Sequence, residues 1–400
     1  DMYTQTNQPE LALSIYQELY YKSDDDYLKA QADLLMGRIR IAQGDLEGGF
    51  NNYQDAVNNY PLAYDSYSAL SALVEAEQPV DELQRGLINY YVGKYDLAVE
   101  AFDRYLAGSA GLKDKALYYK ALAVRAAGLE KASLDSNERF NLNVQGGMES
   151  DKQAIVLWSQ LISDYPTSSY RVDAMEDIIY TQNTYMGQIG LAIQTALAFV
   201  ADAPDSSYAA SLLWTAGRYY TLDDKPLEAA ETWTQIGLDH PEADEAFEGL
   251  FFAGILYYQA GKLDQAANNF NRAVLISTEP LETAGAYLWL GKTSEKLDDA
   301  EASRRWWQTA LETDPNGYYS IRAKELLNNE PVFQPPASIN LNIDLASERR
   351  SAAVWMRTSF NVPGEINLEY DRNLFTDPRM IRGMEYFKLG LYPEASAEFE

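Results

Sequence analysis

Residues 261–273 read Gly-Lys-Leu-Asp-Gln-Ala-Ala-Asn-Asn-Phe-Asn-Arg-Ala and follow an apolar run over 247–260. Gly261 is predicted to end the preceding helix, because glycine adopts a positive φ at a helix C-terminus at little cost. A second helix is predicted to begin at Leu263, which places Ala266 and Phe270 four residues apart on one face. The small residue lets the first helix approach closely, and the aromatic ring fills the space beside it. This stretch therefore predicts one helix–turn–helix unit.

The same pair, a small residue followed four positions later by an aromatic one, recurs along the chain. The further pairs are Ala12/Tyr16, Gly49/Tyr53, Ala98/Phe102, Ala154/Trp158, Ala229/Trp233, Ala302/Trp306 and Ala395/Phe399, and Ala192 keeps the register with Ala196. Successive small residues are spaced by 37, 49, 56, 38, 37, 37, 36 and 93, so five of the eight spacings lie between 36 and 38. A fixed period close to the ~34 residues of a tetratricopeptide indicates a solenoid of helix pairs. We therefore predict an all-α fold, a right-handed superhelical solenoid of tetratricopeptide-like helix pairs.

The irregular spacings predict where this array, residues 1–329, is interrupted. The 49-residue spacing leaves room for one additional short helix, and helices are predicted at about 62–76 and 81–92. The 56-residue spacing predicts an insertion at about 128–148, after a helix at about 112–127. Insertions of this kind project from one face of a solenoid, often the binding face.

A change of pattern follows the helix predicted at 316–329. Residues 331–336 read Pro-Val-Phe-Gln-Pro-Pro, which excludes a helix and favours an extended segment. An extended Pro-rich strap over 330–345 is therefore predicted to cross the solenoid near its C-terminal end. A helical linker region is predicted over 346–400, and it ends in a last pair that starts at 378. Because the sequence stops at Glu400, inside a predicted helix, we expect a truncated repeat whose parent chain continues.

Composition narrows the classes of partner. The net charge of −28 argues against nucleic acid and against anionic membranes, since both require clusters of cationic side chains. The favoured interpretation of this acidity is a solvated, solubilising surface, and the alternative is a groove for a cationic partner. There is no cysteine, which excludes disulfides and thiolate metal sites. No stretch has the ~20 consecutive apolar residues of a transmembrane segment, and no signal-peptide pattern is present.

No pattern of residues predicts catalysis. The run Asp24-Asp25-Asp26 precedes a predicted helix, where acidic side chains cap amides, and Asp223-Asp224 and Asp298-Asp299 are interpreted in the same way. The only histidine, His240, precedes Pro241 in a predicted turn. We therefore assign no catalytic, cofactor-binding or metal-binding residue and no cofactor.

Thirty tyrosines include adjacent pairs on predicted helices, such as Tyr118-Tyr119, Tyr219-Tyr220 and Tyr257-Tyr258. Adjacent side chains on a helix point about 100° apart, so one can enter the core while the other faces a groove or solvent. Exposed rings on a concave face could stack on sugars. The favoured interpretation is that they fill contacts between helices.

The last 85 residues carry a family resemblance. Residues 316–327 (NGYYSIRAKELL), 331–336 (PVFQPP) and 377–400 (DPRMIRGMEYFKLGLYPEASAEFE) resemble the superhelical and linker regions of soluble lytic transglycosylases. In that family these regions precede a goose-lysozyme-like catalytic domain, which uses a glutamate followed by serine. The only Glu-Ser pair here, Glu149-Ser150, lacks the family's surrounding motif, and Ser150 is predicted to cap a helix instead.

The resemblance implies a non-catalytic scaffold of a cell-wall enzyme, which would position a missing C-terminal catalytic domain on peptidoglycan. It implies an extracytoplasmic location, in the periplasm or cell envelope. The implied partners are peptidoglycan glycan strands or cell-envelope proteins, together with the catalytic domain in cis. The alternative is a free-standing tetratricopeptide module that binds a peptide or a partner protein. Whether the parent is an enzyme stays open, and the 400 residues alone are not expected to cleave peptidoglycan.

Overall fold

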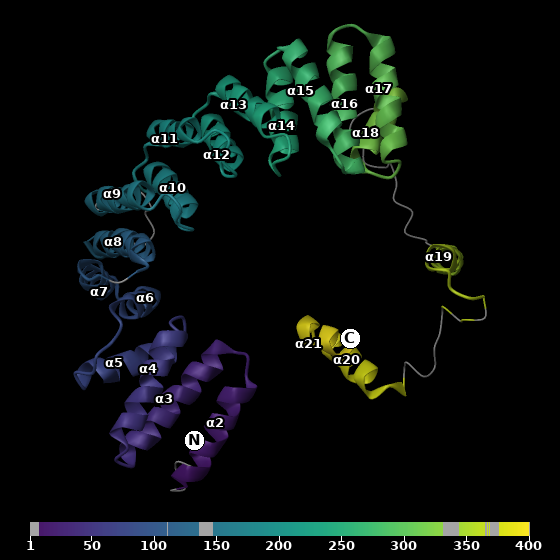
Figure 1. Cartoon of the computed structure of the whole chain (residues 1–400). Helices are drawn as coiled ribbons and strands as arrows, with labels where there is room; N and C mark the ends of the chain where they lie inside the picture. Colours follow the sequence, from purple (N-terminus) through teal and green to yellow (C-terminus); the bar gives the residue numbers. More distant parts are fainter. Residues whose placement is uncertain are drawn as a thin grey trace. The chain divides into compact units, whose positions relative to one another are not determined.

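The computed structural model describes residues 8–109, 111–135, 147–330, 344–364, 366, 368 and 376–399, with only the backbone given for 132–135. Every regular element in these ranges is helical (Figure 1). The chain forms two compact units, Asp1–Glu330 and Pro331–Glu400, which are described separately. No helix in the described ranges is both long enough and apolar enough to cross a membrane.

The first unit is a succession of short helices and one π-helical turn, η2. Their bounds are α2 Pro9–Lys22, α3 Asp26–Ala42, α4 Leu46–Asn59, α5 Tyr64–Glu75, α6 Glu82–Tyr91, α7 Tyr95–Ala107, α8 Lys113–Asp135, α9 Met148–Asp164, α10 Arg171–Tyr180, η2 Thr181–Tyr185, α11 Ile189–Asp202, α12 Ala209–Leu222, α13 Pro226–Asp239, α14 Ala246–Gln259, α15 Leu263–Ile276, α16 Pro280–Lys296, α17 Ala300–Thr313 and α18 Tyr318–Leu327.

Successive helices contact one another from α2 to α18, and helices two apart, such as α6 and α8 or α14 and α16, also touch (Figure 1). This chain of neighbour contacts is the arrangement of a solenoid, so the predicted all-helical solenoid of helix pairs is confirmed. The additional short helix predicted at about 62–76 is α5, which packs on α3 and α4.

A glycine on the first helix of a pair receives the aromatic ring of the second helix. In each case the glycine lies 16 residues before the ring, and a Cβ atom there would overlap it: Gly37/Tyr53, Gly86/Phe102, Gly217/Trp233, Gly254/Phe270, Gly291/Trp307 and Gly383/Phe399. Phe270 and Phe102 are fully buried by this contact. Burying a side chain of that size contributes about 1.5–3 kcal/mol, so the contact is a main source of stability within each of these six pairs.

One predicted pair has the wrong register. Trp306 was expected to be the buried ring of its repeat, but Trp306 is half-buried and Trp307 takes that place. The Trp307 indole N–H donates to the carbonyl of Leu288, 3.2 Å away, as the Trp233 indole donates to Trp214 at the same distance. With Ser303 as the small residue in place of Ala302, the spacing from Ala266 becomes 37. Two adjacent tryptophans leave the register ambiguous in the sequence.

The region of the predicted insertion also differs from expectation. Helix α8 was expected to end near residue 127 but continues to Asp135, and 136–146 lie outside the described residues. Ser150 was expected to cap the next helix. It lies instead inside the first turn of α9, whose N-cap is Gly147, and it packs against Gly128. Gly128 is the physical reason, because without a side chain it leaves space that the Ser150 side chain occupies.

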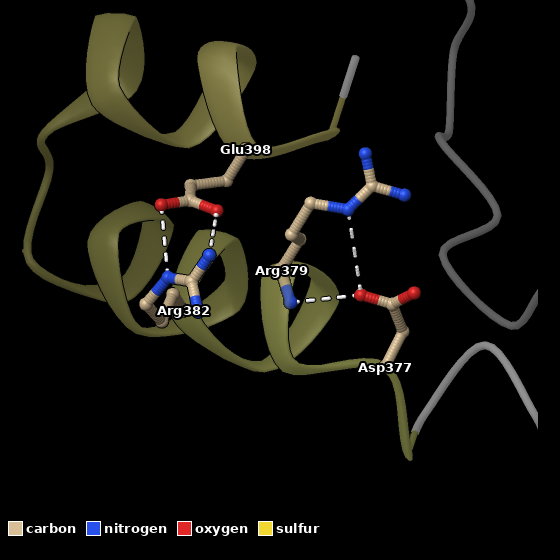
Figure 2. Close-up of polar contacts among 4 residues, drawn as sticks. All are labelled: Asp377, Arg379, Arg382 and Glu398. Carbon is tan, nitrogen blue, oxygen red and sulfur yellow. Dashed lines mark hydrogen bonds and ion pairs between the residues drawn. The ribbon is translucent and has the colours of Figure 1, made fainter.

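The second unit contains α19 Leu345–Phe360, α20 Pro378–Lys388 and α21 Tyr392–Phe399. Figure 2 shows the Arg382 guanidinium on α20 donating to both carboxylate oxygens of Glu398 on α21, at 2.9 and 2.7 Å. Asp377 caps α20 by accepting from the backbone N–H of Arg379 at 2.8 Å (Figure 2). The pair has the turn and the glycine–aromatic contact of the first unit. Most of the strap predicted at 330–345 falls on 331–343, outside the described residues.

Candidate binding site

The regular alternation of α-helices is interrupted between α10 and α11. The five residues of η2 follow Tyr180 directly as a π-helical turn. Such turns are wider than an α-helical turn and often occur at functional sites. The chain leaves the turn at Gly187, whose φ of +64° lies in the left-handed region. The sequence contains no proline or charge signal at this point that would have predicted it.

A cavity of about 400 Å³ lies beside this turn. Its lining comes from α10, η2 and α12: Glu176, Ile179, Tyr180, Asn183, Thr184, Leu212, Thr215, Arg218, Tyr219 and Leu222. Tyr180 and Leu222 are 46% and 69% exposed, so apolar side chains stand in contact with solvent here. Volumes of this size accept small ligands or single side chains. We call these ten residues the central cavity.

Arg125 on α8 holds the turn in place from the neighbouring repeat. Its Nη1 donates to Asp177 Oδ1 at 3.1 Å and to Thr181 Oγ1 at 2.8 Å. The guanidinium carbon also lies 5.0 Å from the Trp158 ring centre and 5.2 Å from that of Tyr185, which places it in cation–π range of both. The charge is thus shared between an ion pair and two rings. This network links α8 to both α10 and η2.

A cluster of tyrosines continues from this network across α6, α8 and the residue that precedes α10. Its rings, Tyr90, Tyr91, Tyr118, Tyr119 and Tyr170, make successive edge or stacked contacts, with centroids 5.1–6.1 Å apart. The Tyr118 hydroxyl donates to Asp177 Oδ2 at 2.9 Å. Burial and the Asp177 charge raise the pKa of Tyr118, so its hydroxyl remains a donor at neutral pH.

One carboxyl group near Arg125 and one in the cavity wall have raised pKa values. Burial raises the pKa of Asp151 to about 6, although the Arg125 charge opposes this change. Burial, followed by the charges of Asp173 and Asp177, raises the pKa of Glu176 in the cavity wall. Asp177 itself accepts hydrogen bonds from Arg125 and Tyr118 on separate oxygens. Burial between packed helices therefore determines the pKa values of Asp151 and Glu176, and Asp177 is occupied by its two hydrogen bonds.

Two of the three carboxylate runs singled out in the sequence contain a helix-capping residue, as predicted. Asp25 caps α3 by accepting from the N–H groups of Tyr27 and Leu28, and Asp299 caps α17 through Ala302 N–H. Asp223 instead forms an ion pair with Lys225 at 2.7 Å.

His240 follows α13 directly, as the residue at its C-cap. Among the described residues, no group of three or more Asp, Glu or His side chains is arranged so that it could hold a metal ion. The assignment of no catalytic or cofactor residue stays a prediction.

The tyrosine pairs divide as predicted only in part. Tyr257 is buried and Tyr258 is half-buried, whereas both members of Tyr118-Tyr119 and of Tyr219-Tyr220 are half-buried. Sequence reasoning treated these rings as filler and missed the cavity, because neither the π-helical turn nor the Arg125 contacts, 52 and 56 residues away, leave a local pattern.

No protein-family model matches the chain, and no curated protein matches it. Several solved structures resemble it. The C-terminal part of a tetratricopeptide-repeat protein from Cytophaga hutchinsonii aligns over 72% of this chain and 98% of its own, with 15% identity and a TM-score of 0.41. The apo form of RapI aligns over 92% and 95%, with 11% identity and a TM-score of 0.38. A tetratricopeptide repeat protein from Parabacteroides merdae aligns over 75% and 97%, with 16% identity and a TM-score of 0.27.

At these scores the likenesses assign neither a family nor a function. The helix pairing, the neighbour contacts and the repeated glycine–aromatic contact belong to this chain's own geometry. On that geometry the described chain is an all-helical solenoid of tetratricopeptide-like helix pairs.

Proposed function

We propose that this chain is a protein-interaction scaffold, and that its central cavity binds an apolar side chain of a partner peptide. The observation that carries the proposal is an open cavity of about 400 Å³ beside a π-helical turn that Arg125 fixes from the next repeat. Tyr180 and Leu222 offer apolar surface to the anchor. Asn183 and Thr215 supply hydrogen-bonding groups for the main chain on either side of it.

Repeat solenoids commonly bind partners along extended surfaces, and the helices of this array supply such a surface. A cavity held by contacts between repeats is already formed before the partner arrives. Binding then avoids the cost of ordering the site, which is the general advantage of preorganisation.

Peptide selection on the intact chain tests this function. A library of random peptides is displayed, binders are selected on the chain, and the best are made synthetically for calorimetry. Thr215→Trp fills the cavity from α12, and Gln235→Trp adds the same ring on the exposed face of α13. The proposal predicts that Thr215→Trp lowers the affinity for the selected peptides at least tenfold and that Gln235→Trp leaves this affinity unchanged. Equal affinities for both variants, or no selectable binder, would count against it.

A second proposal keeps the cell-wall interpretation. It rests on the sequence resemblance of 316–400 alone. In this proposal the chain is an extracytoplasmic scaffold that holds peptidoglycan strands for a catalytic domain in cis. The test is incubation with cell-wall sacculi: cosedimentation without release of anhydro-muropeptides is expected. Chain that stays in the supernatant would contradict it, and peptide binding at the central cavity would then stand by itself.

A further inference from the structure

A second cavity, of about 350 Å³, lies among the first three helices of the array, far along the sequence from the central cavity. Its lining comes from α2, α3 and α4: Gln17, Tyr20, Tyr21, Asp33, Met36, Arg40, Asn51, Asn52 and Asp55. We call it the N-terminal cavity. Nothing in the function proposed above uses it.

The polar groups of this cavity include two acceptors without donors. Asp33 is 2% exposed, and its Oδ1 accepts from Asn52 Nδ2 at 2.9 Å. Asp33 Oδ2 and Asn52 Oδ1 are buried and have no hydrogen-bond partner within the described part of the chain. A buried acceptor left without a donor costs about 1–3 kcal/mol, and more when it is charged. When Asp33 is ionised, its Oδ2 and the Asn52 Oδ1 therefore lack a donor among the described residues.

The polar groups around Asp33 and Asn52 are already engaged in hydrogen bonds with other partners. Both oxygens of Asp55 are engaged, one by the Tyr20 hydroxyl at 2.7 Å and one by Asn59 at 2.8 Å. Tyr20 also shares a hydrogen bond with the Tyr60 hydroxyl. Arg40 lines the cavity, but its Nη1 donates to the Gly48 carbonyl, 3.4 Å away.

Burial and the adjacent Asp55 carboxyl raise the pKa of Asp33 to about 8, while Asn52 and the Arg40 charge oppose this change. The empty cavity therefore favours the protonated form of Asp33. A cation that enters would favour the ionised carboxylate and so release the proton to solvent.

We infer that the N-terminal cavity binds the alkylammonium or guanidinium group of a lysine or arginine side chain on a partner segment. Such a group carries several donors and no acceptor, which matches the unpaired oxygens of Asp33 and Asn52. Met36 and the ring of Tyr20 border the cavity and can cover the aliphatic stem. The chain's net charge of −28 attracts basic segments toward it.

The binding reaction conserves charge and protons. Protonated Asp33 and the ligand cation form an ion pair, and the carboxyl proton leaves to buffer. Near pH 7 the binding of a cation should therefore be accompanied by proton release, and this release should decrease as pH rises because more Asp33 is then ionised before binding.

The probes for the test are Nα-acetyl-lysine amide and Nα-acetyl-arginine amide, with Nα-acetyl-norleucine amide as the uncharged match. Each is titrated into the intact chain by calorimetry at pH 7, in two buffers of different ionisation enthalpy. We expect one or both cations to bind, with proton release, and norleucine amide to give no binding. The lysine and arginine arms show which head group the cavity prefers.

Variants locate the binding. Asp33→Asn keeps the size of the side chain but removes the acid. It should lower the affinity for the cation at least tenfold and abolish proton release. Asn51→Arg, at an exposed lining position, should also block binding by placing a guanidinium at the cavity, and it leaves the buried residues unchanged. Asp65→Asn, on the first turn of α5 outside the cavity, should bind as the parent does. Unchanged affinity in Asn51→Arg and Asp33→Asn, or no cation binding to the parent chain, would overturn the inference.

Discussion

In six of the helix pairs, a single glycine on the first helix lets the aromatic ring of the second helix approach closely. Gly254 faces the Phe270 ring, and Gly217 and Gly291 face tryptophan rings in the same way. The small residue on the second helix, which the sequence pattern used, is therefore only half of the packing contact. The other half is the glycine on the first helix. The ring fits because both helices present little side chain at the crossing.

Replacing Gly254 by alanine should destabilise the chain by about 1–3 kcal/mol, because the new methyl group overlaps the Phe270 ring in a packed core. Gly190, on α11, has open space around its Cβ position. Gly190→Ala should therefore be neutral or stabilising by up to about 1 kcal/mol, through helix propensity. Urea unfolding followed by circular dichroism compares the two. Equal effects would show that the glycine contact is unimportant.

The two adjacent tryptophans of α17 should differ in how much each contributes to the free energy of unfolding. Trp307 is 5% exposed and donates to Leu288, so Trp307→Ala should cost about 3–5 kcal/mol through the cavity left behind. Trp306 stacks on Tyr287, with ring centroids 5.6 Å apart, at a half-buried position. Trp306→Ala should cost only about 1–2 kcal/mol. The melting temperatures of the two variants test the corrected register, and the reverse order would restore the original one.

Asp151 should make stability depend on pH. Its pKa is raised from 3.8 to about 6, so the folded chain holds this proton more tightly than the unfolded chain does. The resulting stabilisation is complete below pH 3.8 and is lost as pH rises through about 6. Asp151→Asn lacks this loss, so its melting temperature should rise relative to the parent between pH 4 and pH 7. A difference between the two chains that does not change with pH would contradict the assignment.

The position of η2 depends on a contact from another repeat. Arg125 reaches it from α8 through Thr181 and at the same time pairs with Asp177 on α10, with both charged side chains more than four-fifths buried. Removing one partner of a buried ion pair leaves the other charge uncompensated, which is more costly than losing an exposed pair. The turn and the cavity beside it should therefore respond together to a change in α8.

Arg125→Met should lower the stability of this region by about 3–5 kcal/mol and speed amide exchange across η2. Lys131→Met on the same helix removes an exposed pair with Asp96, whose side chains are 66% and 69% exposed. That variant should change stability by no more than about 1 kcal/mol. Hydrogen exchange read by mass spectrometry over 177–188 separates them. Slow exchange of η2 in Arg125→Met would show that the turn does not depend on the arginine.

The elements also show what sequence could predict. Helix existence and most turns followed from Pro and Gly signals and from the 37-residue spacing, because solenoid contacts are local in sequence. The extension of α8 to Asp135 was missed since its last turns carry weak periodicity. The central cavity was missed because Arg125 and Thr181 meet across 56 residues, and only the folded chain brings them together.

At the scale of the whole array, stability is a sum of contacts within repeats and between neighbouring repeats. Each repeat of the first unit packs on the next, so a change in one repeat acts mainly on its neighbours. The net charge of −28 acts over a longer range and favours basic partners at modest salt. In the two proposals, the central cavity accepts an apolar side chain and the N-terminal cavity accepts a cationic one.

Photo-crosslinking tests the central claim, that partner peptides bind at the central cavity. A photoreactive amino acid is placed at Thr215 in the cavity wall, and separately at Gln235 on the exposed face of α13. Each chain is irradiated with a selected peptide, and the products are mapped by mass spectrometry. The account predicts crosslinks from position 215 to the apolar anchor of the peptide and none from position 235. A bound peptide that crosslinks from 235 but not from 215 would contradict it.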